Sequence, residues 1–138
     1  MEKYAVVATG ADKERLKQAL SLAIILSVKY NCSISIVVPK LDLRNSLLNK
    51  VIGSDFLNSL IKNRPDTTLE GRSVKLYSRR TYRPYGERNI VLGLWGGIDM
   101  LEKIDQASEA KAIVALSWVE EDLKSWVKNT SVKLVNSS

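Results

Sequence analysis

The 138-residue chain has no histidine and a single cysteine, Cys32. Histidine is the commonest protein ligand of metals and the most frequent general base, so its absence removes Ser-His-Asp and Cys-His machinery and leaves no metal site to be expected. One cysteine excludes an internal disulfide. Cys32 comes just before a predicted strand, where we expect a small buried apolar side chain rather than a nucleophile.

Long apolar runs are also missing. The longest, residues 20–28, contains two serines and is shorter than the roughly 20 residues that span a bilayer. Residues 1–10 lack the charged region, apolar region and cleavage site of a signal peptide, so we expect a cytoplasmic protein with no membrane partner. With 45% apolar and 26% charged residues, the chain has the composition of one ordinary globular domain.

The stretch that indicates the fold most clearly is NIVLGLWGGIDMLEKIDQA, residues 89–107. Residues 90–94 are a nearly continuous apolar run, typical of a parallel strand covered on both faces. Gly96 and Gly97 then allow a turn, and apolar residues recur at helical spacing from Ile98 onward. The stretch predicts a buried central strand, a glycine turn and a helix.

Strands and helices alternate along the rest of the chain. Strands are predicted at residues 4–8, 34–38, 74–77, 90–94, 112–116 and 132–135. Helical patterns lie between them, with a break expected at Gly53 and a capping-box spacing at Ser117 and Glu120. This order resembles that of Rossmann-like domains. It predicts one α/β domain over residues 1–138, a three-layer sandwich with a mainly parallel sheet of five or six strands and helices on both faces.

One connection, residues 78–88, has no helical period. Either the strand before it is antiparallel to its neighbours, or the loop carries the chain back across the sheet in extended form. We expect the crossing route, because extended residues span roughly 3.3 Å each. The expected strand order, numbered along the chain, is then 3-2-1-4-5 with the sixth strand at an edge.

This order predicts a place for a ligand. Ligands of open α/β sheets bind outside the carboxyl ends of the strands where the winding reverses, here between the first and fourth strands. The residues expected to face that crevice are Thr9, Gly10, Asp12, Trp95, Gly96, Gly97 and Asp99, joined by Ser117, Trp118 and Glu120. Glycine turns that open helices suit a phosphate or carboxylate, and tryptophans can cover a base or sugar.

Other interpretations of these residues remain open. The glycines could serve turn geometry alone, and the tryptophans could pack under loops. The carboxylates that follow strand ends could act as acid and base or hold Mg²⁺, or they could simply favour helix N-termini. Neither G-x-G-x-x-G nor G-x-x-x-x-G-K-[ST] occurs, so the sequence indicates no particular nucleotide or cofactor.

Positive charge is concentrated in one segment. Residues 62–88 contain eight basic and three acidic side chains, so they hold +5 of the chain's net charge of +6. The candidate contacts for a nucleic acid or another anion are Arg79, Arg80, Tyr82, Arg83, Tyr85 and Arg88. Arginine binds phosphates and stacks well, and tyrosine stacks on bases. The same arginines could instead pair with the acidic face of residues 89–138 or lie in the interface of a homo-oligomer.

The leading hypothesis is a binding domain for a phosphate-bearing ligand, either a nucleotide or a nucleic acid. A small enzyme that acts on such a ligand through carboxylates is the second. The third is an interaction module that assembles through the arginine and tyrosine loop.

Overall fold

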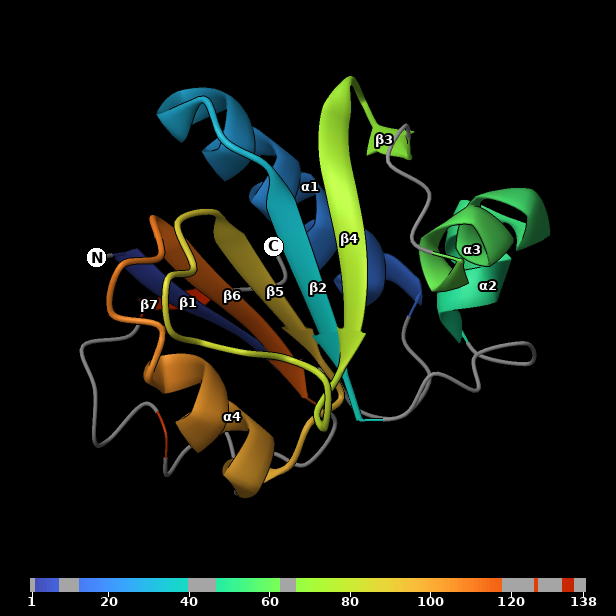
Figure 1. Ribbon diagram of the computed structural model, residues 1–138. Coiled ribbons are helices and arrows are strands. Elements are labelled where there is room, and N and C mark those ends of the chain that lie inside the picture. Colours follow the sequence, from blue (N-terminus) through green and yellow to red (C-terminus); the bar gives the residue numbers. More distant parts are fainter. Residues whose placement is uncertain are drawn as a thin grey trace.

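The computed structural model describes residues 2–7, 13–39, 47–62, 67–117, 126 and 133–135. Seven strands form one sheet in the order β3-β4-β2-β5-β6-β1-β7 (Figure 1). The strands are β1 (Glu2–Val7), β2 (Ile34–Val38), β3 (Thr68–Leu69), β4 (Arg72–Ser78), β5 (Ile90–Leu94), β6 (Ala112–Ser117) and β7 (Lys133–Val135). The helices are α1 (Lys13–Tyr30), α2 (Leu47–Ile52), α3 (Ser54–Ile61) and α4 (Ile98–Asp105). None of the described helices has the length and apolar character to cross a membrane.

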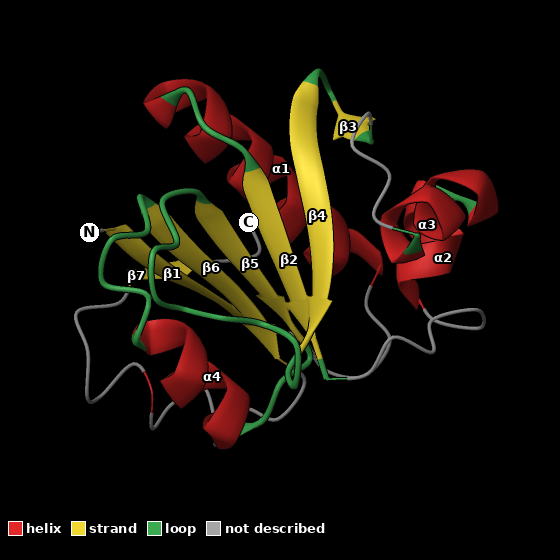
Figure 2. Ribbon diagram, viewed as in Figure 1, coloured by secondary structure: helices red, strands yellow, loops and turns green. Residues whose placement is uncertain are grey.

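The sheet confirms the predicted mainly parallel α/β architecture. All the pairings among β4, β2, β5, β6, β1 and β7 are parallel, and of the strands that the structure describes only the two-residue β3 runs antiparallel, beside β4. Since β4 is parallel to β2, the chain must return across the sheet to reach β5. Residues 79–89, which we call the crossing loop, make that return as predicted (Figure 2).

The predicted strand order is wrong at β1. We expected β1 between β2 and β5, but β5 pairs with β2 and β6, and β1 pairs with β6 and β7 at the other end. The reason lies in where α1 packs. The helix covers β6 and β5, so the crossover from β1 to β2 passes over both of these strands and leaves them between β1 and β2.

Two clusters of buried side chains use alternate residues of the same strands, so they lie on opposite faces of the sheet. One cluster joins α1, α2 and α3 to residues such as Ile36 and Leu92. The other joins α4 and Tyr82 to residues such as Val37 and Val91. In Figure 1, α1 lies behind the sheet, and α4 lies in front of it.

The predicted centre of the sheet is confirmed. All five residues of β5 are buried, and β5 has a parallel neighbour on each side. The predicted break at Gly53 is also confirmed: Gly53 separates α2 from α3 with φ of 90°, a conformation that glycine adopts at no steric cost.

Gly93 lets α4 approach the middle of β5. A Cβ atom at this position would lie 2.7 Å from Cδ1 of Ile104, which is well inside van der Waals contact. Interiors are close-packed and yield little, so an added methyl group must displace the helix or strain the Ile104 side chain. The distance between α4 and the sheet therefore depends on the absence of a side chain at Gly93.

Gly93→Ala should lower the free energy of unfolding by about 1 to 3 kcal/mol, as expected for an overpacked core. Ile104→Val removes the Cδ1 atom and should cost about 0.5 to 1.5 kcal/mol by itself. The double variant should lose less than the sum of the two, because the clash is gone. Urea unfolding of the four proteins measures this coupling, and strict additivity would show that Gly93 does not set the approach of α4.

Glu2 joins the start of β1 to the end of α1. The Tyr30 hydroxyl donates to its Oε2 (2.6 Å), the Lys29 ammonium donates to both oxygens (3.1 and 3.2 Å), and the Tyr4 hydroxyl donates to Oε1 (3.1 Å). The hydrogen bond from Tyr30, followed by that from Lys29, lowers the pKa of Glu2 from 4.5 to about 2.

The folded pKa of Glu2 lies below its ordinary value, so ionised Glu2 stabilises the fold above about pH 4.5, and this contribution is lost as the pH falls toward 2. Glu2→Gln has no group that titrates there. The difference in Tm between the wild type and Glu2→Gln should therefore be largest near neutral pH and shrink on acidification. A difference that stays constant between pH 7 and pH 2 would contradict a role for the Glu2 charge.

Candidate functional site

The crevice predicted between the first and fourth strands is not formed as expected, because β6 lies between β1 and β5. Ser117 ends β6, and Trp95, Gly96, Gly97 and Asp99 follow β5. The other predicted members of this site, Thr9, Gly10, Asp12, Trp118 and Glu120, lie outside the described residues.

The turn after β5 is filled by the protein itself. A Cβ atom on Gly96 would overlap the Met100 side chain, which comes from the first turns of α4. The Trp95 side chain is partly buried against the α1 side of the core. Its backbone N–H donates to the carbonyl of Leu116 (2.7 Å). Its φ of 60° lies in the left-handed region, where a bulky residue is rare and has to be held by its surroundings. This geometry favours the packing interpretation of Trp95 and Gly96 over a phosphate cradle.

The acidic and nucleophilic candidates gain little support. Asp99 is exposed and faces Arg79 across 4.0 Å. The described part of the chain contains no group of three or more Asp, Glu or Cys side chains able to hold a metal ion. Cys32 is half-buried beside the first core cluster, and burial raises the pKa of its thiol, which favours the unreactive protonated form.

The crossing loop covers part of the α4 face of the sheet (Figure 2). It starts with a tight turn in which Tyr82 N–H donates to the Ser78 carbonyl (3.0 Å) and Ser78 N–H donates to the Thr81 hydroxyl (3.0 Å). The Tyr82 side chain is only 1% exposed, and its ring meets that of Tyr77 edge to face at 5.7 Å. Tyr82 therefore serves as a core residue inside the loop.

Glu87 holds the second half of the loop. Although only 9% exposed, its carboxylate accepts the Tyr82 hydroxyl on Oε1 (3.1 Å), and the backbone and side-chain N–H groups of Asn89 on Oε2 (3.3 Å each). Asn89 in turn accepts the N–H of Ser33, just before β2 (3.2 Å). Burial, followed by the nearby Glu87 charge, raises the pKa of the Tyr82 hydroxyl far above its ordinary value. These bonds connect the loop to the sheet at both of its ends.

The four loop arginines all point outward, as exposed side chains. Arg79 and Arg88 make only long ion pairs, with Asp99 (4.0 Å) and Glu109 (3.9 Å). Arg83 donates from Nη1 to the Arg80 carbonyl (3.1 Å), which fixes its guanidinium against the loop backbone. Within the described residues, the Arg80 guanidinium has no hydrogen bond or ion pair.

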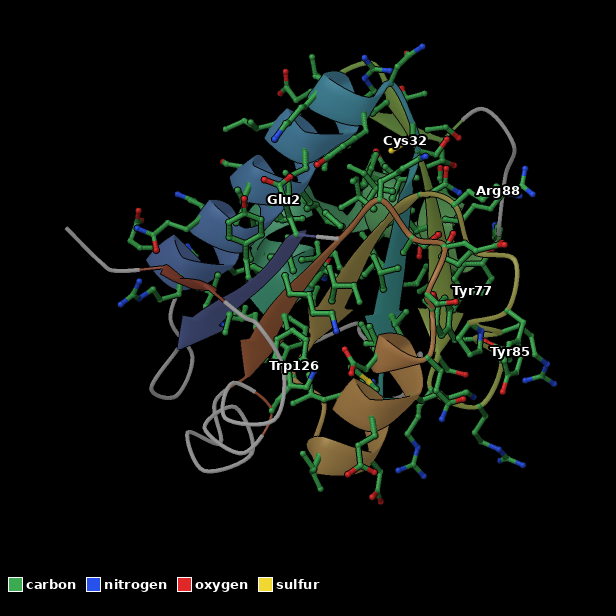
Figure 3. The ribbon with its side chains drawn as sticks, turned by 90° about the vertical axis from the view of Figure 1, so that its left-hand side faces the viewer. Glu2, Cys32, Tyr77, Tyr85, Arg88 and Trp126 are labelled. Atoms are coloured by element: carbon green, nitrogen blue, oxygen red, sulfur yellow. The ribbon has the colours of Figure 1, made fainter. Side chains whose placement is uncertain are left out.

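The structure separates the two predicted stacking residues. Tyr82 is buried and cannot offer its ring to a base, so its predicted role as a contact is wrong. Tyr85 is 81% exposed and remains a candidate. Figure 3 shows Tyr77, Tyr85 and Arg88 on one side of the molecule. From the sequence, Glu87 was considered only as one of the three acidic residues of segment 62–88, and its buried hydrogen bonds were not predicted. The signal that could have indicated its role is that it is the only acidic side chain in the loop.

Tyr82→Phe should lower the free energy of unfolding by about 1 to 3 kcal/mol, because the buried Glu87 carboxylate loses a donor. Amide hydrogens of residues 80–88 should also exchange faster, while those of β5 change little. Tyr85→Phe is the matched control: it removes a hydroxyl from an exposed ring and should stay within about 0.5 kcal/mol of the wild type. Equal effects of the two variants would show that the bond between Tyr82 and Glu87 does not hold the loop.

Comparisons of this chain with protein-family models, with curated proteins and with solved structures gave no match.

Proposed function

We propose that this chain binds nucleic acid through the exposed side chains of the crossing loop. The observation that carries the proposal is a loop whose interior is fixed by Tyr82 and Glu87, and whose exterior presents arginines and one tyrosine. A fixed backbone favours binding, because less conformational freedom is lost when the partner arrives.

The present partners of the arginines can be exchanged for phosphates. Ion pairs near 4 Å between exposed side chains contribute at most about 1 kcal/mol and are screened by salt, so those of Arg79 and Arg88 offer little resistance. Arginine also presents a planar fork of donors that matches a phosphate group. The charges of the loop are thus available to a polyanion.

A small nucleotide at the turn after β5 has less support. Met100 occupies the space that a cradle at Gly96 would need, and β1 is not the neighbour of β5. Self-association through the loop remains the alternative to nucleic acid, since exposed Tyr and Arg side chains are also common in protein interfaces.

The triple substitution of Arg79, Arg80 and Arg83 to Ala should weaken binding to DNA of any sequence. It should also flatten the plot of log affinity against log salt by roughly 2 to 3 units, because each neutralised phosphate contributes about 0.7 to 0.9. A matched control replaces Lys13, Lys17 and Lys50, which are exposed on α1 and α2 and carry the same total charge. The control should keep the wild-type slope.

Equal slopes for the two triple variants would show that the net charge of the protein, and not the loop, attracts the polyanion. Sedimentation without nucleic acid tests the alternative. If the wild type binds neither single-stranded nor duplex DNA at low salt, and the arginine variant sediments as a smaller species, the loop is a self-association surface and the proposal is wrong.

A further inference from the structure

A cavity of about 350 Å³, open to solvent, lies beside the crossing loop. Side chains that line it include Tyr77, Tyr82, Tyr85, Arg83 and Glu87. Small-molecule sites in proteins run from roughly 300 to 1,000 Å³, so this cavity has the size of a site for one small group. It also lies inside the surface to which we have assigned nucleic acid.

The walls of the cavity are aromatic. Tyr77 is half-buried at the end of β4, Tyr82 stands edge-on to it, and Tyr85 projects from the rim with 81% of its surface exposed. Because a free aromatic face can stack on any base, the Tyr85 ring is suited to cover a planar group that enters beside Tyr77.

The polar groups of the cavity can bind the edge of a base. Glu87 accepts three hydrogen bonds, from the Tyr82 hydroxyl and two N–H groups of Asn89. An ionised carboxylate has about four lone-pair sites and no donor, so one more N–H group can be accepted. Arg83 uses Nη1 for loop carbonyls and keeps other N–H donors for an acceptor atom.

We infer that this cavity holds one unpaired nucleic-acid base, with Tyr85 stacked on the base and Glu87 and Arg83 at its edge. The unpaired edge of every base has an N–H donor for the Glu87 carboxylate and a neighbouring acceptor for the Arg83 guanidinium. In adenine, cytosine and guanine the donor is an amino group, and in thymine and uracil it is the N3–H group beside a carbonyl oxygen. This inference depends on the proposed function, because phosphate contacts must first bring the strand to the loop.

An unpaired base also implies a preference for single strands. Removing a base from a duplex costs a few kcal/mol, and this cost is least when the strand is already single. The loop therefore uses its arginines to bind the phosphates and the cavity to hold a base of a single strand.

The test compares DNA single strands about ten nucleotides long, within the range of known binding sites. An adenine strand, a thymine strand and an abasic strand carry the same phosphates, and fluorescence anisotropy gives the affinity of each. The adenine and thymine strands should both bind more tightly than the abasic strand. Tyr85→Ala should weaken the binding of both roughly five- to 150-fold, the effect of one lost stacked base, and should leave the abasic strand unchanged. Tyr85→Phe keeps the ring and should retain the difference between these strands and the abasic strand.

The outcomes separate this inference from the proposed function. If the three strands bind equally and Tyr85→Ala changes none of them, while Arg79→Ala combined with Arg80→Ala weakens all, the cavity holds no base and the arginine surface stands. If Tyr85→Ala weakens the abasic strand as much as the adenine and thymine strands, Tyr85 does not act by stacking on a base, and the inference is wrong while the arginine surface stands. If no strand binds at low salt, both proposals fail.

Discussion

The structure depends on covering both faces of a parallel sheet whose central strand is wholly buried. Each residue of β5 is out of contact with solvent, so its two faces need separate apolar layers. The helices α1, α2 and α3 supply one layer, while α4, the crossing loop and Trp126 contribute to the other. The burial of β5 therefore requires the elements on each side of the sheet to present apolar side chains to it.

The need to cover the sheet also explains the structure of the crossing loop. Since no helix follows β4, the loop itself must bury apolar surface, and it does so with Tyr82 and Pro84. Burial of Tyr82 draws Glu87 inward, because a buried hydroxyl needs a hydrogen-bond partner. With these groups inside, the arginines and Tyr85 are left outside. The proposed binding surface is therefore a consequence of how the sheet is covered.

The glycines in and after β5 differ in their role from the glycines of phosphate-binding turns. Gly93 and Gly96 both lie where a Cβ atom would meet side chains of α4. Their absent side chains allow close packing of α4 on β5, so they support the fold rather than an open cradle. A similar glycine pattern can thus arise from packing alone, which is why short glycine motifs carry little weight without their structural context.

The sequence by itself determined every strand of the described sheet except β3, the helices α1 to α4, the break at Gly53 and the burial of residues 90–94, because apolar period and glycine conformation are local properties. It also indicated that the arginines of residues 79–88 are concentrated in one loop. Only the tertiary structure decided the place of β1, since strand pairing depends on the route of α1 over the sheet. It alone also placed Tyr82 inside and Tyr85 outside, because two tyrosines in one loop differ in burial and hydrogen bonding, neither of which leaves a periodic signal.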